Sequence, residues 1–516
     1  MTKIVYLPLD ERPCNYDYPR YLAEMTDCQL AVPSRAILGD KKQPADTEAV
    51  AEWLIREADG ADYAMVSIDM LLYGGIVPSR LHRLELAELE RRLHTLREIK
   101  AAHPSLKLYV FHLITRAPAY SSSEEEPDYY AIYGRELYEF GWLTDKRKRE
   151  GLDTAEEARV AEIVEQVPSA IFDDFLARRA VNKQMNERSV ALVDEGVIDY
   201  MVVPLDDNSQ YGYTSSEQRS LAHLIQEGEL MDRIAIYPGA DEIGCTMFSR
   251  IFCEIQQYEP LIHVRYSSTL GPAIIPKYED RSLNESIKHH ITAAGGYVAD
   301  SFEAPDIYLM VHSPATSGVS VAETTDRYDE RHHSYFSEVN LREFVSAIAR
   351  YARHGRVMAL ADVALCNGGD DVLMKLLARQ GLLSRLDGYA AWNTSGNAIG
   401  TVVSHAIITA CNRARTTPDT QKERASRRYY YYRLLEDWAY QAVVRQRITE
   451  ELLPGAGASY FQLSHVQELV ETWIEEQLQQ FADEYLPADQ GKLTLSEVTI
   501  PWNRMFEIGF RVETSS

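Results

Sequence analysis

Two pairs of adjacent carboxylates, Asp206-Asp207 and Asp241-Glu242, follow short apolar runs that are typical of buried strands. Like charges side by side repel, which raises the pKa of one carboxyl and leaves an acid beside a base. In α/β barrels, residues just past the C-terminal ends of strands form the active site. We therefore predict that these four residues are catalytic. The simpler interpretation of Asp241 and Glu242 is a helix N-cap followed by an acid in the first turn.

Polar side chains follow most of the other predicted strands as well. Any one of them could be a helix cap or a turn residue. Together they suit a small, neutral, hydroxyl-rich ligand, because carboxylates accept from sugar hydroxyls, Arg donates in a fixed fork and Trp packs on the apolar face of a pyranose. The predicted substrate-binding residues are Asp10, Arg12, Asp69, Arg116, Tyr211, Asp362, Asn367, Trp392 and Asn393.

The elements that must position these residues are short apolar runs alternating with helical patterns. Runs of this kind indicate parallel strands buried on both faces and separated by helices. Helical spacing of apolar residues marks 85–100 and 283–294. The nine predicted strands are Ile4–Leu9, Tyr63–Ile68, Leu108–Leu113, Tyr200–Leu205, Ile234–Tyr237, His263–Tyr266, Ile307–Val311, Val357–Ala361 and Gly388–Trp392.

We predict an α/β fold with a (β/α)8-barrel-like catalytic domain over residues 1–415. A helical segment, 117–197, is inserted on the rim that carries the site, and a mostly helical region follows at 416–516. Nine strands are one too many for a simple eight-stranded barrel, and the stretch 263–311 resembles a βαβ unit of its own. The alternative is therefore two doubly wound α/β domains.

Composition restricts the classes of partner. The 516 residues carry a formal net charge of -25, with 45% hydrophobic and 25% charged residues, as in a soluble globular protein. This charge argues against nucleic acid and anionic membranes as partners, since phosphate binding needs a basic surface. The six widely spaced cysteines show no zinc spacing, and no signal peptide or apolar run of ~20 residues is present. We expect free thiols, a cytoplasmic location and no cofactor; oligomeric state is left open.

Three motifs resemble those of a bacterial family of about this size, which is known only as a domain of unknown function. The motifs are Leu7-Pro-Leu-Asp-Glu-Arg-Pro-Cys-Asn15, Val363-Ala-Leu-Cys-Asn-Gly-Gly-Asp370 and Ala391-Trp-Asn-Thr-Ser-Gly-Asn397. The resemblance extends over nearly the whole chain. It implies no chemistry.

A second resemblance is local. Gly239-Ala-Asp-Glu242 resembles the Gly-Gly-Asp-Glu strand end of the β-N-acetylhexosaminidases, with Ala240 in place of the second glycine and Tyr237 in place of a preceding histidine. In that family the acetamido oxygen of the substrate attacks its own anomeric carbon. The resemblance implies that Asp241 orients the acetamido group, that Glu242 is the general acid/base, and that Arg12 binds the sugar.

Asp206 and Asp207 offer a rival dyad. Adjacent aspartates at the end of a fourth strand resemble another group of barrel enzymes with the same acetamido-assisted chemistry, in which case Asp241 and Glu242 would bind hydroxyls. A third arrangement takes one residue from each pair as nucleophile and acid. Carboxyl groups ~5 Å apart would then fit a retaining mechanism, and ~6.5–9.5 Å an inverting one.

The favoured function is that of an exo-acting β-N-acetylhexosaminidase, a glycoside hydrolase that uses a substrate-assisted retaining mechanism on GlcNAc or GalNAc in a small carbohydrate. One alternative is a hydrolase or lyase that holds Mg²⁺ or Mn²⁺ through Asp69, Asp206, Asp241, Asp362 and Asp370. Another is a non-catalytic sugar-binding protein.

Overall fold

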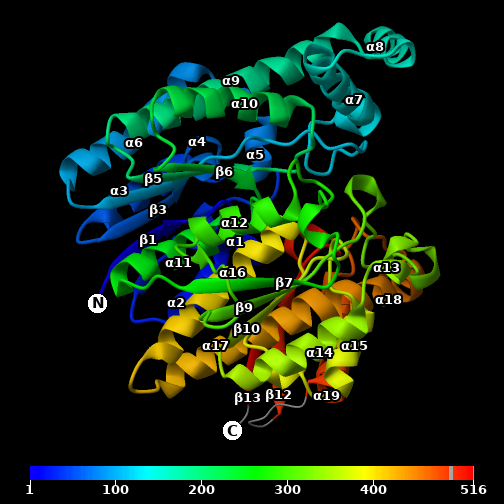
Figure 1. The fold of residues 1–516 in the computed structure, drawn as a ribbon. Helices are drawn as coiled ribbons and strands as arrows, with labels where there is room; N and C mark the ends of the chain where they lie inside the picture. Colours follow the sequence, from blue (N-terminus) through cyan, green and yellow to red (C-terminus); the bar gives the residue numbers. More distant parts are fainter. Residues whose placement is uncertain (487–491, 515–516) are drawn as a thin grey trace. The chain divides into compact units, whose positions relative to one another are not determined.

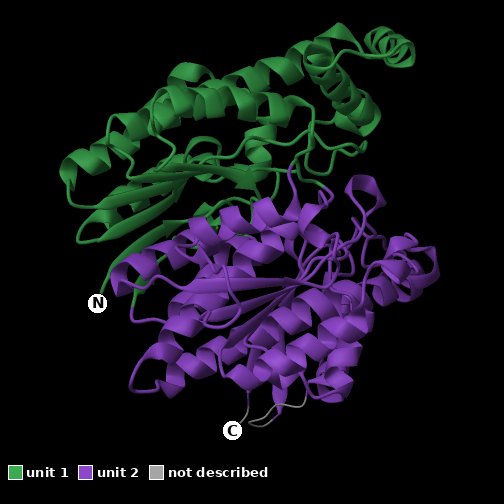
Figure 2. Cartoon of the chain, in the orientation of Figure 1, with its two compact units in different colours: residues 1–11, 28–244, 278–280 green, residues 12–27, 245–277, 281–516 purple. Residues whose placement is uncertain are grey.

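The computed structural model describes residues 1–486 and 492–514 of the chain (Figure 1). Its contacts divide the chain into two compact units (Figure 2). Unit 1 contains residues 1–11, 28–244 and 278–280, and unit 2 contains residues 12–27, 245–277 and 281–516. This division differs from the predicted boundary between residues 415 and 416.

Unit 1 is built on an open, six-stranded parallel sheet with the strand order β2-β1-β3-β4-β5-β6. The strands are β1 (Lys3–Leu7), β2 (Gln29–Ala31), β3 (Tyr63–Ser67), β4 (Lys107–Phe111), β5 (Tyr200–Leu205) and β6 (Ile234–Pro238). Strands β1, β3 and β5 are almost entirely buried, as expected for a parallel sheet covered by helices on both faces.

Helices connect these strands and cover the sheet; Figure 1 shows α9 and α10 running along one side of it. They are α3 (Thr47–Ala58), α4 (Ile68–Tyr73), α5 (Ile76–Leu81), α6 (Leu86–Ala102), α7 (Tyr130–Arg149), α8 (Thr154–Gln166), α9 (Ser169–Asp194) and α10 (Tyr213–Glu227). The predicted insertion 117–197 is helical, with α7, α8 and α9. It has a small apolar core of its own, which includes Tyr130, Leu137, Ile163 and Phe175.

Unit 2 contains a second open parallel sheet, with the order β11-β10-β9-β7-β8. The strands are β7 (Leu261–Tyr266), β8 (Tyr297–Val298), β9 (Ile307–His312), β10 (Val357–Asp362) and β11 (Gly388–Ala390). The apolar side chains of β9 and β10 pack with those of α12 (Leu283–Ala293) and α16 (Ser395–Ala414) in one core.

The remaining helices of unit 2 are α1 (Pro13–Tyr16), α2 (Tyr18–Glu24), α13 (Ser334–Ser337), α14 (Leu341–Tyr351), α15 (Asp371–Arg379), α17 (Thr420–Arg433), α18 (Arg445–Arg447) and α19 (Gln467–Tyr485), and α11 (Ile243–Gln256) enters it from unit 1. Leu434–Val444 and Ile448–Leu452 are π-helical. An antiparallel hairpin of β12 (Leu493–Thr499) and β13 (Gly509–Thr514) follows, so the C-terminal region is not helical throughout.

The α/β class and the parallel pairing are confirmed, but the predicted barrel is not found. The described strands form two open parallel sheets and a hairpin, and no closed barrel is present among them. All nine predicted strands exist. They divide into five in unit 1 and four in unit 2, so no single sheet contains the eight strands of a barrel.

Candidate functional site

Acidic residues of unit 1 lie just after the carboxyl ends of its strands. Asp10 follows β1, Asp69 follows β3, Asp206 follows β5 and Asp241 follows β6. Because all of these strands are parallel, the four positions share one edge of the sheet. The chain passes from β1 to β2 on one side and then to β3 on the other, so Asp10 and Asp69 lie at the topological switch point. Open α/β sheets bind ligands at this place.

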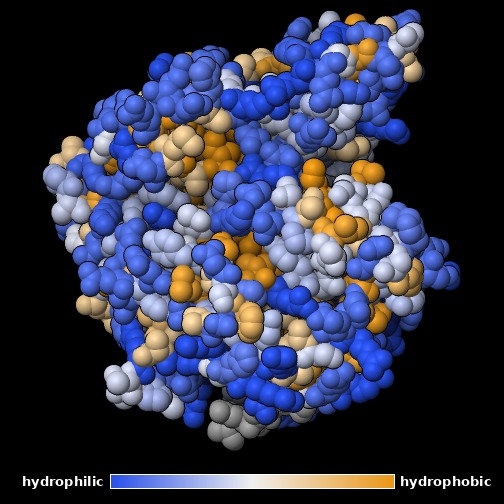
Figure 3. Space-filling view, viewed as in Figure 1, coloured by the Kyte–Doolittle hydropathy of each residue, from blue (hydrophilic) through white to orange (hydrophobic). Residues whose placement is uncertain are grey.

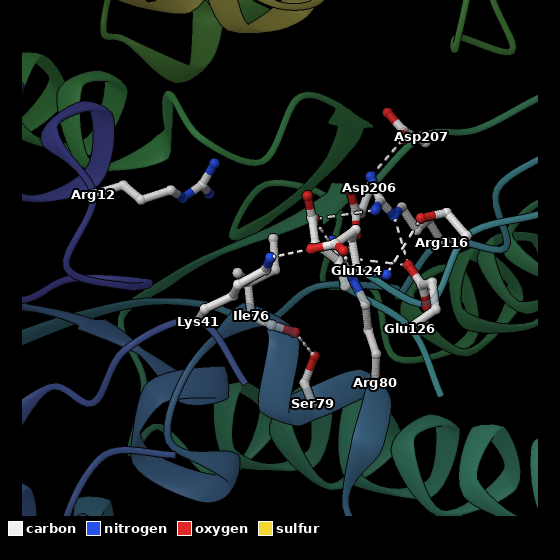
Figure 4. Close-up of polar contacts among 12 residues, drawn as sticks. Arg12, Lys41, Ile76, Ser79, Arg80, Arg116, Glu124, Glu126, Asp206 and Asp207 are labelled. Carbon is white, nitrogen blue, oxygen red and sulfur yellow. Dashed lines mark hydrogen bonds and ion pairs between the residues drawn. The ribbon is translucent and has the colours of Figure 1, made fainter. Parts of the chain in front are cut away.

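Two arginines, the buried Arg80 and the mostly buried Arg116, bind carboxylates at this edge (Figure 4). The Arg80 guanidinium donates to Asp206 at 2.7 Å and to Glu125 at 3.0 Å. The Arg116 guanidinium donates to Asp207 at 3.0 Å, to Glu126 at 2.9 Å and to Glu125 at 3.1 Å. We call these six residues, Arg80, Arg116, Glu125, Glu126, Asp206 and Asp207, the arginine–carboxylate cluster. Four carboxylates face two guanidiniums, so the cluster has an excess of acidic groups.

The two adjacent aspartates are held by different arginines. Asp206 is paired with Arg80 and Asp207 with Arg116, and the side chain of Asp207 is 21% exposed. The φ angle of Asp207 is +34°, a left-handed conformation that non-glycine residues rarely adopt. Strained backbone of this kind concentrates at functional sites. Burial raises the pKa of Asp207 to about 6, and the neighbouring Asp206 contributes to the rise.

Asp69 is a second carboxyl with an altered affinity for protons. It is 1% exposed, and its Oδ2 accepts a hydrogen bond from the Leu113 backbone N–H at 2.9 Å. Burial raises the pKa of Asp69 to about 8, with a further contribution from Asp206. Asp69 is therefore mostly protonated at neutral pH. It can donate a proton or a hydrogen bond where an ordinary aspartate can only accept one.

Local structure explains how the two arginines are positioned. Gly74 and Gly75 both have positive φ angles, and this turn directs the chain from α4 into α5, which carries Arg80. Within α5 the Ser79 hydroxyl donates to the Ile76 carbonyl at 2.6 Å (Figure 4). The backbone of Arg116 is held from α9, where Arg179 donates to the carbonyls of Thr115 and Arg116 at 2.9 and 3.0 Å.

Glu125 and Glu126 are members of the cluster that sequence reasoning missed. They belong to the Ser121–Glu126 stretch at the start of the inserted segment, where three consecutive glutamates suggest a solvated turn. The structure instead buries Glu126 to 3% exposure, and burial raises its pKa. The preceding Glu124 pairs with Lys41 at 2.5 Å. The signal available in the sequence was the run of acids, Glu124–Glu126, that begins eight residues after Arg116.

Asp241 and Glu242 are present at the edge of the sheet but are more enclosed than Asp207. Asp241 is 6% exposed and Glu242 is fully buried. Helix α11 begins at the next residue, Ile243. Among the four predicted catalytic residues, the side chain of Asp207 is thus the most accessible one.

Tyr211, a predicted substrate-binding residue, contacts the inserted helices. Its hydroxyl donates to Glu150, which follows the last residue of α7, and its ring packs edge-on against Trp142 at 5.1 Å. The contacts of Tyr211 therefore tie the loop after β5 to the inserted helices.

The other predicted substrate-binding residues belong to unit 2. Arg12 pairs with Glu507 at 3.6 Å and lies over the Trp502 ring at 4.5 Å. The Asn367 backbone N–H donates to the Asn393 carbonyl at 2.9 Å, and both residues have positive φ angles. The remaining two are Trp392, which packs against Phe506 at 5.9 Å, and Asp362, which accepts from Tyr389 at 3.2 Å.

The predicted set is thus divided between the two units, with Asp10, Asp69, Arg116, Tyr211 and the four catalytic candidates in unit 1 and Arg12, Asp362, Asn367, Trp392 and Asn393 in unit 2. The metal-ligand set of the alternative hypothesis is divided in the same way. Among the described residues, no group of three or more His, Cys, Asp or Glu side chains is arranged to hold a metal ion.

The family model described as a protein of unknown function, DUF4127, matches residues 4–511. The chain belongs to this family. The matched range spans both units, and it covers the positions of the arginine–carboxylate cluster of unit 1 and of the motifs 363–370 and 391–397 of unit 2. A search of curated proteins found no match.

Two further observations concern the chain as a whole. Within the described part of this DUF4127 chain, every helix is too short or too polar to cross a membrane. All six cysteines are free thiols, as predicted from their spacing.

Proposed function

We propose that the protein is a glycoside hydrolase whose catalytic dyad is Asp206 and Asp207. The observation that carries the proposal is that two adjacent aspartates pair with two different arginines, and that the more accessible aspartate has a raised pKa. A carboxyl group with a raised pKa beside a second carboxyl group is a usual basis of acid/base catalysis at a glycosidic bond.

Asp207 is the proton donor in this scheme. Its pKa of about 6 keeps part of the population protonated near neutral pH, and its partial exposure lets it reach the leaving-group oxygen. Arg116 fixes its carboxyl group at 3.0 Å. After the leaving group departs, the same carboxylate accepts a proton from the incoming water.

Asp206 has the complementary role. Its ion pair with Arg80 at 2.7 Å fixes the carboxylate as a hydrogen-bond acceptor beside the donor. A carboxylate in this position can accept the N–H of an acetamido group and align the acetamido oxygen for attack on the anomeric carbon. The excess of acidic groups in the cluster also suits hydroxyl donors. The proposed substrate is a small carbohydrate with a terminal β-linked GlcNAc or GalNAc.

We assign the catalytic dyad to Asp206 and Asp207 rather than to Asp241 and Glu242. A general acid must reach the bond that it protonates, and Glu242 is fully buried whereas Asp207 is not. Asp69 is 1% exposed, so by the same criterion we propose no direct contact between Asp69 and the sugar.

The test is nitrophenol release from a panel of aryl α- and β-glycosides, each with and without the N-acetyl group. Wild type, Asp207→Asn and Glu242→Gln are compared, with Asp194→Asn as a control at an exposed aspartate of unit 1, and a chelator is added in a parallel series. Cleavage of β-N-acetyl sugars that is slowed in Asp207→Asn, unchanged in Asp194→Asn and insensitive to the chelator is the expected result. Cleavage of sugars that lack the acetamido group would show that the acetamido group does not assist the reaction, and would rule out the substrate-assisted step. Full activity of Asp207→Asn would overturn the dyad.

A further inference from the structure

Ser267, His312 and Asp370 form a hydrogen-bonded chain in unit 2 that the proposed glycosidase does not use. The Ser267 hydroxyl lies 2.9 Å from Nδ1 of His312, and Nε2 of His312 lies 3.0 Å from Oδ2 of Asp370. His312 and Asp370 are fully buried, and Ser267 is 5% exposed. Residues of two strand ends and one loop meet here: Ser267 follows β7, His312 ends β9, and Asp370 lies in the loop after β10.

The surroundings of Asp370 determine the direction of these hydrogen bonds. Asp370 also accepts from Tyr335 at 2.5 Å and from Arg331 at 3.2 Å. Although burial alone would raise the pKa of Asp370, the bonds to His312 and the charge of Arg331 lower it to about 2. An ionised Asp370 can only accept, so Nε2 of His312 carries the proton, and in the neutral ring Nδ1 is the acceptor. The Ser267 hydroxyl is then the donor to Nδ1.

This pattern meets the general requirement for an activated serine. A nucleophile and its base lie within hydrogen-bond reach, and a third group orients the base. The Ser313 hydroxyl adds a further polar group beside them. The Ser313 backbone N–H donates to the Ser267 oxygen at 2.9 Å, and the Ser313 hydroxyl is fully buried with no hydrogen-bond partner among the described residues. A buried hydroxyl without a partner is costly unless something binds it.

The position in the sheet is the second, independent observation. In unit 2 the chain passes from β7 to β8 on one side and then to β9 on the other, so the switch point lies between β7 and β9. Ser267 and Ser313 directly follow these two strands. Ligands of open α/β sheets bind at the carboxyl ends of the two strands that flank the switch point.

We propose that Ser267 is the nucleophile of a second active site, which hydrolyses short-chain acyl esters. The Ser267 oxygen adds to the ester carbonyl while its proton passes to Nδ1 of His312, and the Ser313 hydroxyl donates to the carbonyl oxygen. Collapse of the adduct breaks the ester C–O bond, and the alkoxide leaves with the proton from Nδ1. Water then hydrolyses the acyl-serine by the same steps in reverse, which releases the acid and restores the serine.

The backbone packs closely against Ser313. A Cβ atom on Gly271 would come within 2.2 Å of the Ser313 hydroxyl, so the backbone passes close to this side of the site. Arg331 and Tyr335, from the segment between β9 and α14, contact Asp370 from the other side. This close packing is the reason for proposing a short acyl chain. Because Ser267 is 5% exposed, an ester can reach it only after the residues that cover it move.

The test is covalent labelling of the full-length protein with a small fluorophosphonate, followed by mass spectrometry of the labelled peptide. The expected result is one label on Ser267 that is lost in Ser267→Ala and slowed about 10²-fold or more in His312→Asn. Ser268→Ala is the matched control, because the Ser268 hydroxyl only accepts from the Leu270 backbone N–H in a local turn. Nitrophenyl acetate hydrolysis should follow the same order.

Absence of label on Ser267 in wild type would overturn the proposal. The hydrogen bonds among Ser267, His312 and Asp370 would then be structural only. Equal hydrolysis of nitrophenyl acetate by wild type and Ser267→Ala would also overturn it, provided that thermal unfolding curves show both proteins to be folded. The proposal does not depend on the glycosidase, because its residues, its probe and its readout are all different.

Discussion

At the scale of the residue, Asp207 sets the expected pH dependence of glycoside cleavage. A general acid works only while it is protonated, and burial raises the pKa of Asp207 to about 6. We expect kcat/KM to fall as the pH rises through about 6. A pH series of initial rates on an aryl β-N-acetylhexosaminide measures this directly. A rate that stays constant from pH 5 to pH 8 would contradict the assignment of Asp207 as the acid.

Asp69 gives a residue-scale prediction about stability. Its pKa is raised to about 8 in the folded protein, against about 3.9 in an unfolded chain. Folding is therefore favoured by protonation, and this contribution is present below pH ~4 and is lost as the pH rises towards 8. Asp69→Asn removes the titrating group, so its free energy of unfolding relative to wild type should rise by up to about 1.4 kcal/mol per pH unit between pH 4 and 8. Urea unfolding of both proteins at pH 5 and pH 8 tests this. The same difference in free energy of unfolding between Asp69→Asn and wild type at both pH values would contradict it.

At the scale of the element, sequence reasoning found the strands that are buried and missed those that are not. The nine predicted strands are apolar runs that lie inside the sheets. The two missed parallel strands, Gln29–Ala31 and Tyr297–Val298, lie at sheet edges, have three and two residues, and are half-buried or exposed. An edge strand of this length carries no buried run from which it could be predicted.

The arginine–carboxylate cluster was only partly predictable for a related reason. Asp206, Asp207 and Arg116 follow strands directly, so their positions could be inferred from the strand pattern. Arg80, Glu125 and Glu126 reach the cluster through a helix and a loop, and their ion pairs with residues up to 126 positions away in the chain have no local signature. His312 is a further example: the predicted strand ended at Val311, whereas β9 ends at His312.

Helix α7 provides an element-scale prediction. A Cβ atom on Gly141 would lie 2.2 Å from the ring of Tyr213, the first residue of α10, and α10 follows the loop that carries Asp207. We expect Gly141→Ala to destabilise the protein by about 1–3 kcal/mol and to raise KM, because α10 and this loop must shift. Gly455→Ala, where nothing lies within 4 Å, is the control and should change stability by less than about 0.5 kcal/mol. Equal stability of the two variants would contradict the packing argument.

At the scale of the whole molecule, the same strand order occurs twice. Starting at β1 and at β7, each unit places its second strand on one side of the first and its later strands on the other. The barrel prediction failed because alternating strands and helices are common to barrels and open sheets, and the sequence pattern does not show whether the last strand pairs with the first. The face drawn in Figure 3 is mostly hydrophilic, with hydrophobic residues in small separate groups, which fits the net charge of -25.

The six thiols give a prediction for the molecule as a whole. Five cysteines are buried and Cys28 is partly exposed, and burial raises the pKa of Cys253 to about 12. Thiol reagents attack the thiolate, so we expect one cysteine, Cys28, to react quickly in the native protein and all six to react after unfolding. Ellman titration before and after addition of guanidinium chloride measures both numbers. Rapid reaction of several thiols in the native protein would contradict the described burial.

The central claim, that Asp207 protonates the leaving group of a β-N-acetylhexosaminide, is tested most directly by the dependence of the Asp207→Asn rate on the leaving group. Dinitrophenolate is a good leaving group that departs without being protonated. A methylumbelliferyl group depends more on protonation by the acid, and an alkyl group depends on it most. We expect the variant to retain much of the wild-type rate on the dinitrophenyl glycoside and to lose a factor of about 10²–10⁴ on the poorest leaving group. A loss of equal size on every substrate, or no loss on any, would contradict it.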